Sequence, residues 1–230
     1  MSWFGELYRS AVGKKAVMAV TGIILFGFVL VHMIGNLKLY EGVDEGGHYI
    51  LNNYAGFLRS VGTPAFPTSG LLWIARSVLI VAVLLHIWAA WQLTLMNRAA
   101  RPVSYAGRDV VQATYASRTM RWGGVIILLF VVYHLLDLTF GAANPSFQEG
   151  DVYHNVVASF SRWWISLFYI AANVALGFHL YHGLWSMFQS LGWNHPRFNS
   201  WRRGFAHAFA WIITLGNVSF PLAVLAGFIR

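Results

Sequence analysis

The chain has 230 residues, of which 57% are hydrophobic and only 10% are charged. A soluble domain carries about 25% charged residues, so this composition indicates a membrane protein. The net charge of +8 does not indicate a nucleic-acid partner, because the basic residues lie in short loops between apolar runs. The chain contains no cysteine, which excludes disulfides, iron–sulfur clusters and thioether-linked haem within it; any metal needs histidine, methionine or oxygen ligands.

Five apolar runs are long enough to cross a bilayer, which requires about 20 helical residues. We expect these spans at about residues 16–37, 71–96, 122–141, 163–190 and 205–228. Between the first two, residues 48–61 have the pattern of an amphipathic helix lying on the membrane surface. Pro221 is expected to kink the last span or to lie near its end. The sequence therefore predicts an all-α membrane protein, with residues 1–230 forming one integral membrane domain of five transmembrane helices.

The distribution of basic residues predicts the orientation of this bundle. The N-terminal segment and the loops at 97–121 and 191–204 carry eleven of the sixteen lysine and arginine residues. The two opposite loops and the C-terminus carry four others, together with five of the eight acidic residues. Since cytoplasmic loops are the basic ones, we expect the N-terminus inside and the C-terminus outside.

Each of the first four spans contains histidine, and an imidazole in hydrocarbon marks a candidate functional site. At about 1.5 Å per helical residue, His32 and His134 lie roughly 8 Å and 10 Å below the outer face. His86 and His179 lie roughly 22 Å and 24 Å below it by the same rise. A haem with two axial histidines needs two imidazoles at one depth on facing helices. The depths predict two such haems, stacked about 14 Å apart, with the bundle enclosing them.

His182 would lie nearer 28 Å down, where no other histidine shares its depth. We interpret it as a residue supporting a ligand or facing a quinone, with a packing role equally open. A single intramembrane histidine is often a hydrogen-bonded packing residue or part of a proton relay. Five of them in four spans, at two matched levels, favour haem.

The runs around these histidines carry a resemblance to a known family. They read GIILFGFVLVHMIGN around His32, LLHIWAAWQ around His86, VVYHLLDLT around His134 and FHLYHGLWSMFQSLGW around His179. In this order the chain resembles the di-haem cytochrome b membrane anchor of succinate dehydrogenases and fumarate reductases, of the type with one five-helix subunit. In the family pattern the fourth ligand lies four residues before the glycine of the GLW-like element. Gly183 is that glycine, which selects His179 over His182.

The resemblance implies the same pairing: the first and third helices hold the outer haem b, and the second and fourth hold the inner one. It also implies partners in a bacterial cytoplasmic membrane. A flavoprotein subunit would oxidise succinate, and an iron–sulfur subunit would pass electrons to this anchor on the cytoplasmic side. The anchor would pass them through both haems to menaquinone or ubiquinone among the membrane lipids, or work in reverse. It would be an electron-transfer subunit rather than a complete enzyme, and a higher oligomer of the complex is left open.

Charged residues near the two levels are further candidates. Arg76 lies about 8 Å below the outer face and could meet a haem propionate or extend to the interface. Arg162 is a second candidate for a propionate. Asp137, three residues after His134, could pair with Arg76, protonate a quinone or face the outer water. Basic residues that could meet the inner propionates or the iron–sulfur partner are Lys14, Lys15 and Arg121.

Two other functions compete with this hypothesis. One is the di-haem cytochrome b anchor of a hydrogenase or formate dehydrogenase, which serves a different electron donor. The other is a haem-free proton-coupled transporter that uses the histidines and Asp137 as a proton relay. The spans lack the paired helices broken by glycine or proline that mark many transporters, which disfavours the second alternative.

Overall fold

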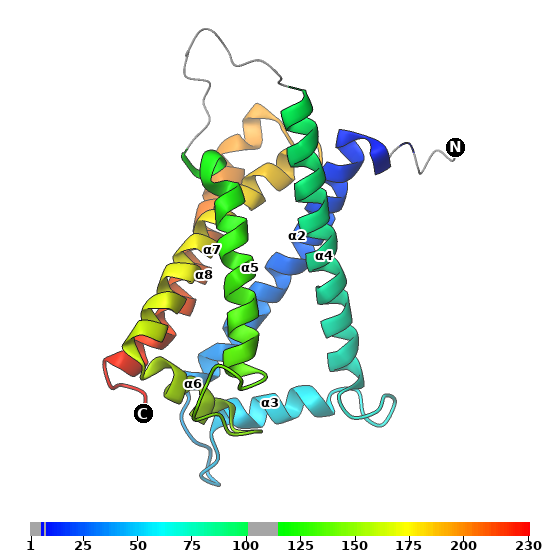
Figure 1. Cartoon of the computed structure of the whole chain (residues 1–230). Coiled ribbons are helices and arrows are strands. Elements are labelled where there is room, and N and C mark those ends of the chain that lie inside the picture. Colours follow the sequence, from blue (N-terminus) through cyan, green and yellow to red (C-terminus); the bar gives the residue numbers. More distant parts are fainter. Residues whose placement is uncertain (1–5, 7, 101–114) are drawn as a thin grey trace.

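The computed structural model describes residue 6, residues 8–100 and residues 115–230, with the side chains of 115–119 excepted. Most of the basic loop at 97–121 therefore lies outside the described residues. The described part is built of helices (Figure 1): α2 (Ala11–Asn36), η1 (Leu37–Tyr40), α3 (Ile50–Ser60), α4 (Gly70–Ala99), α5 (Tyr115–Leu138), α6 (Val152–Phe160), α7 (Trp163–Ser190), η2 (Pro196–Phe198) and α8 (Asn199–Leu225).

The five predicted spans are confirmed as α2, α4, α5, α7 and α8, each with a stretch long and apolar enough to cross a membrane. Four of these helices begin before the predicted span, whereas α7 has the predicted bounds. Thus α2 begins at Ala11, where the Ser10 hydroxyl accepts a hydrogen bond of 3.0 Å from the Gly13 amide and caps the helix. The chain enters α8 at Asn199 directly from the η2 turn. Pro221 lies four residues before the end of α8.

Two short helices lie at one end of the bundle, opposite the N-terminus and on the same side as the C-terminus (Figure 1). The amphipathic helix expected at 48–61 is α3. The second, α6, lies between the third and fourth predicted spans, where the sequence predicts a loop. Its first turn is capped by the Asp151 carboxylate, which accepts a 2.9 Å hydrogen bond from the His154 amide. The helix packs against α3, α5, α7 and α8, so its apolar side is buried by tertiary contacts.

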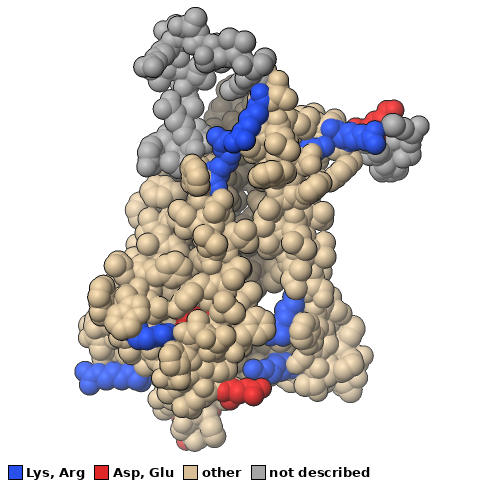
Figure 2. All heavy atoms as spheres, in the orientation of Figure 1, with Lys and Arg blue, Asp and Glu red and all other residues tan. Residues whose placement is uncertain are grey.

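The long helices pack mainly as neighbours α2–α4, α5–α7 and α7–α8, with α2 also touching α7 and α8. The α7–α8 contact is close because Gly177 has no side chain to collide with Thr214. One buried apolar cluster joins α2, α7 and α8, and another joins α7 and α8 to the short helices. In contrast, α4 and α5 leave most of their apolar surface exposed, as expected for helices whose solvent is lipid. On the face shown in Figure 2, charged side chains lie toward the two ends and the middle is uncharged.

Candidate functional site

Two pairs of histidines meet across the bundle. In the first pair, the ring centroids of His32 on α2 and His134 on α5 are 5.9 Å apart, with the ring planes at 89°. In the second pair, His86 on α4 and His179 on α7 are 6.4 Å apart, with the planes at 61°. Each pair therefore joins one helix of the α2–α4 neighbours to one helix of the α5–α7 neighbours.

Glycines on the neighbouring helices define the level of the second pair. A Cβ built on Gly22 of α2 would lie 3.6 Å from Cε1 of His86, and one built on Gly124 of α5 would lie 3.8 Å from Cε1 of His179. Gly22 and Gly124 each precede the histidine of the first pair on their own helix by ten residues. Ten residues of helix rise about 15 Å. Both sides of the bundle thus place the two pairs at levels about 15 Å apart.

The spacing within each pair suits two imidazoles that ligate one metal ion from opposite sides. With each metal–nitrogen bond at about 2 Å, and about 1 Å from each nitrogen to its ring centre, the ring centroids come out roughly 6 Å apart. The described residues contain no group of three or more histidine, aspartate or glutamate side chains that could hold a bare ion. Two opposed imidazoles at this spacing fit a metal whose remaining ligands come from a macrocycle, as in haem.

At the second pair, a threonine orients His86. The Thr21 hydroxyl lies 3.1 Å from Nδ1 of His86 and donates its proton to the Val17 carbonyl at 2.8 Å. With its proton on a carbonyl of its own helix, the Thr21 hydroxyl can accept from His86 Nδ1–H. This tautomer leaves Nε2 of His86 with the free lone pair, as a metal ligand requires. The opposite residue differs, since Nδ1 of His179 is buried without a hydrogen-bond partner among the described atoms.

At the first pair, a tyrosine takes the place of the threonine. The Tyr169 hydroxyl donates to Oδ2 of Asp137 at 2.8 Å and lies 3.4 Å from Nδ1 of His134. The same proton count makes Tyr169 the acceptor for His134 Nδ1–H, leaving Nε2 free. The partner histidine, His32, is exposed and stacks on Phe28 of its own helix at 5.3 Å.

Asp137 is fully buried, and its partners correct two expectations. Its carboxylate accepts hydrogen bonds from Arg162 at 3.0 Å, Ser159 at 2.5 Å and Tyr169 at 2.8 Å. Of the three alternatives for Asp137, the pairing with Arg76 and the exposure to the outer water are wrong. Arg162 is nearer because α6 and the start of α7 fold back over the end of α5. Direct contact between this carboxylate and a quinone would require its present partners to move.

The other charged candidates lie nearer the surface. Arg76 is exposed, with its guanidinium carbon 5.0 Å from the centre of the Trp73 ring. At the other end of the bundle Lys14 is buried, and its ammonium donates to the carbonyls of Tyr8 at 3.0 Å and Arg9 at 3.1 Å. Lys15 and Arg121 are exposed. Of the inner-face candidates, Lys15 and Arg121 thus keep their charges available to another molecule.

His182 stands apart from both pairs. It is half-buried, and its ring lies 6.5 Å from that of its neighbour Tyr181. Within the described part of the chain, no histidine ring faces it from another helix. The structure thus brings His179, and not His182, opposite His86.

The sequence pattern did not indicate the residues that hydrogen-bond to the paired histidines and their partners, or that pack beside them. They are Thr21, Tyr169, Ser159, Gly22 and Gly124. The only available signal was a hydroxyl residue or a glycine within an apolar run, which also occurs for packing reasons. Which of these face a histidine depends on the rotation of two helices about their axes, and sequence separation does not give that rotation.

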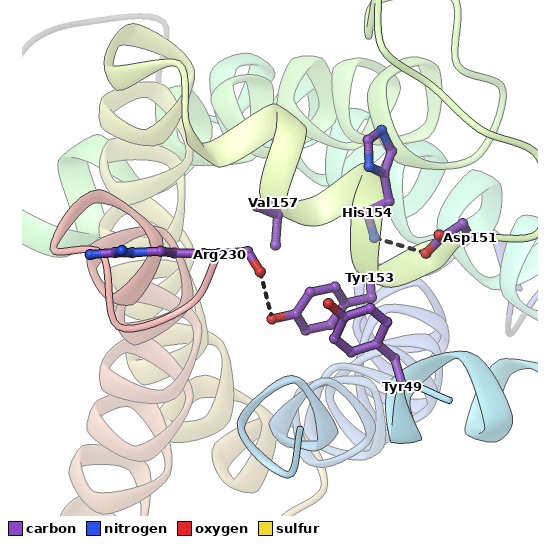
Figure 3. Close-up of a pocket in the computed structure, with 6 residues that line it drawn as sticks. All are labelled: Tyr49, Asp151, Tyr153, His154, Val157 and Arg230. Atoms are coloured by element: carbon purple, nitrogen blue, oxygen red, sulfur yellow. Dashed lines mark hydrogen bonds between the residues drawn. The ribbon is translucent and has the colours of Figure 1, made fainter. Parts of the chain in front are cut away.

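A separate cavity of about 270 Å³ lies at the end of the bundle that carries α3 and α6 (Figure 3). Within it, the rings of Tyr49 and Tyr153 stack at 3.6 Å, and the Tyr153 hydroxyl donates to the carbonyl of Arg230 at 3.2 Å. Burial, followed by the effect of Tyr49, raises the pKa of Tyr153. Asp151 caps α6 and accepts a further bond from Asn52 of α3. These groups tie α3, α6 and the C-terminal segment together.

The fold and site define a multi-pass all-α membrane protein with two interhelical histidine pairs at separate levels. A family model for the succinate dehydrogenase/fumarate reductase transmembrane subunit matches residues 94–218, and the chain belongs to this family. The matched region contains His134 and His179, whereas His32 and His86 precede it. No curated protein and no solved structure matches the chain. Membership implies association with the catalytic subunits of such a complex.

Proposed function

We propose that the chain is the membrane anchor of a succinate:quinone oxidoreductase and carries electrons through two b haems. His32 and His134 would ligate the outer haem, and His86 and His179 the inner one. The observation that carries this proposal is the double pairing of imidazoles, at 5.9 Å and 6.4 Å, from helices that face each other across the bundle. In each pair one imidazole has Nδ1 tied to a hydroxyl, which leaves Nε2 free as a ligand.

The chain's own contribution is to hold the four imidazoles and, at His86 and His134, to place a hydroxyl against Nδ1. Each haem would supply a one-electron carrier between its two imidazoles. Gly22 and Gly124 keep the space beside the inner ligands free of side chains. Propionate partners would come from Arg76 or Arg162 at the outer level and from exposed Lys15 or Arg121 at the inner level.

The orientation of the bundle determines the face at which each partner would lie. The N-terminus and the turn between α7 and α8 lie at one end (Figure 1), and the basic segments at that end predict the cytoplasmic face of a bacterial membrane. An iron–sulfur subunit, itself bound to a flavoprotein subunit, would dock there and deliver electrons to the inner haem. The outer haem would then reduce a menaquinone or ubiquinone near the opposite face, or the path would run in reverse. Family membership favours this donor over a hydrogenase or formate dehydrogenase, and favours an electron-transfer subunit over a transporter.

A haem count tests the proposal directly. The complex is purified in mild detergent from cells that also express the neighbouring subunits, and its haem is measured as the pyridine haemochrome. We expect two b haems per anchor chain and copurification of a flavoprotein and an iron–sulfur protein. A count of zero or one contradicts the ligand assignment. Purification of this chain alone contradicts the assigned partners.

A further inference from the structure

A continuous chain of buried polar groups runs from the first histidine pair to an ion pair. Asp137 has no exposed surface and accepts from Arg162, Ser159 and Tyr169. Arg162 keeps 22% of its side chain exposed and donates a further bond of 3.3 Å to the Ala143 carbonyl. The carboxylate is thus paired and satisfied, which holds its position rigidly in an apolar surrounding.

This arrangement determines the direction of the Tyr169 hydroxyl. A phenol has one proton, and the nearest acceptor for it is the Asp137 carboxylate at 2.8 Å. The remaining lone pairs of the hydroxyl are then available to His134 Nδ1, 3.4 Å away. Without Asp137, the same hydroxyl could turn its proton toward Nδ1 and favour the opposite tautomer of the imidazole.

The second pair has a simpler arrangement. Thr21 donates to the backbone of its own helix, so the hydroxyl that accepts from His86 is fixed by neutral carbonyls alone. At His134 the equivalent hydroxyl is fixed by a carboxylate. A charged acceptor polarises the hydroxyl more strongly than a neutral one, so the two ligands differ in how strongly their surroundings increase their basicity.

We propose that Tyr169, held by Asp137 and Arg162, is a positioning residue that fixes the tautomer of His134 and strengthens it as an electron donor. This inference rests on the proposed function, in which His134 is an axial ligand of the outer haem. Hydrogen bonding to the far nitrogen makes an imidazole more basic and favours the oxidised metal. The hydrogen bonds from Asp137 through Tyr169 to His134 therefore lower the reduction potential of the outer haem. The comparison is with the potential of the same haem when these bonds are absent.

The test replaces the phenol and measures both haem potentials by redox titration of the visible spectrum in the purified complex. Tyr169→Phe removes the acceptor for Nδ1–H and is expected to raise the potential of the outer haem alone. Tyr133→Phe is the matched control, because Tyr133 lies beside His134 and its ring is 6.2 Å from that of Tyr169. Within the described residues the Tyr133 hydroxyl makes no hydrogen bond to His134, so the control should leave both potentials unchanged.

The outcomes separate this inference from the proposed function. A wild-type complex without two haems contradicts the proposed function itself. Two haems with equal outer potentials in wild type and Tyr169→Phe overturn the positioning role while the haem assignment stands. Should Tyr169→Phe not assemble, Asp137→Asn keeps an oxygen acceptor but removes the charge. It is expected to raise the same potential, because the charge itself is lost and the hydroxyl is less strongly polarised, and an unchanged value there also overturns the role.

Discussion

In each histidine pair a hydroxyl group lies against Nδ1 of one imidazole, but the groups that surround this hydroxyl differ between the pairs. At the first pair, His134 is held through Tyr169 by the Asp137 carboxylate of α5, which pairs with Arg162 at the start of α7. At the second pair, His86 is held by Thr21 of α2, and glycines on adjacent helices lie against both rings. The first level depends on an ion pair between Asp137 and Arg162, whereas the second depends on close helix packing. The two levels should therefore fail in response to different substitutions.

The largest effect is expected where an imidazole itself is removed. His179→Ala deletes one of the two rings of the second pair and should abolish the inner haem, leaving one haem per chain. His182→Ala is the matched control three residues further along α7, since His182 faces no histidine ring in the described structure. Pyridine-haemochrome analysis of the purified complexes measures both. Loss of haem in His182→Ala with retention in His179→Ala would reverse the assignment.

A bulky side chain beside the His179 ring should disturb the second pair through packing alone, because it changes no charge. Gly124→Val places methyl groups against His179, because even a Cβ there lies 3.8 Å from Cε1. We expect a substoichiometric inner haem and an intact outer one. Gly123→Val makes the identical change one residue away, where a Cβ has no atom within 4 Å, and should retain two haems. Equal haem content in the two variants would show that Gly124 does not define the pocket.

At the first pair the vulnerable feature is the ion pair. Asp137→Asn leaves the Arg162 guanidinium without its counter-ion in a mostly buried site. Removing one member of a fully buried pair costs about 3–5 kcal/mol. Since Arg162 is 22% exposed, we expect a smaller loss, on the order of 2 kcal/mol. The midpoint of thermal unfolding in detergent should fall accordingly.

The control for this prediction is Asp44→Asn, which makes the same change in a surface turn and should lower the midpoint much less. The double variant Asp137→Asn with Arg162→Gln should be less destabilised than the sum of the single variants, because it removes both charges. Strict additivity would mean that the two side chains do not stabilise each other.

The smallest effect is expected outside both histidine pairs, in the turn before α3. The Asp44 carboxylate accepts hydrogen bonds of 2.9 Å from the His48 and Gly46 amides and of 2.6 Å from the Asn53 side chain. The His48 amide is the main cause that lowers the pKa of Asp44. A lowered pKa in the folded state means that the carboxylate stabilises this turn above its ordinary pKa. The contribution is lost as pH falls through the folded value.

Carbon-13 NMR of the Asp44 carboxyl in the purified protein follows this titration. Asn53→Ala should raise the pKa of Asp44, because one of its hydrogen bonds is lost. Asn52→Ala changes the adjacent amide, which binds Asp151 instead, and should leave the titration of Asp44 as it is. An equal response to the two substitutions would remove Asn53 as a cause.

Sequence alone predicted the five spans because each apolar run is as long as a bilayer is thick, which leaves helix as the means of satisfying the backbone. It also predicted two levels of histidines, since helical rise converts residue number into depth. It missed α6, whose short apolar face is buried only by α3 and the ends of three long helices. It offered Arg76 as one partner for Asp137 because both lie at similar depth, yet depth gives no information on which helices are neighbours.

What the sequence determined by itself is therefore one-dimensional: the class of protein, the number of spans and the depth of each histidine. The tertiary structure decided the rest, because contacts depend on the rotation of each helix and on its choice of neighbour. It placed Arg162, and not Arg76, on Asp137, turned Tyr169 toward His134, and set Gly22 and Gly124 against His86 and His179. Depth is encoded residue by residue along one helix, whereas a hydrogen bond between helices is fixed only when both have packed.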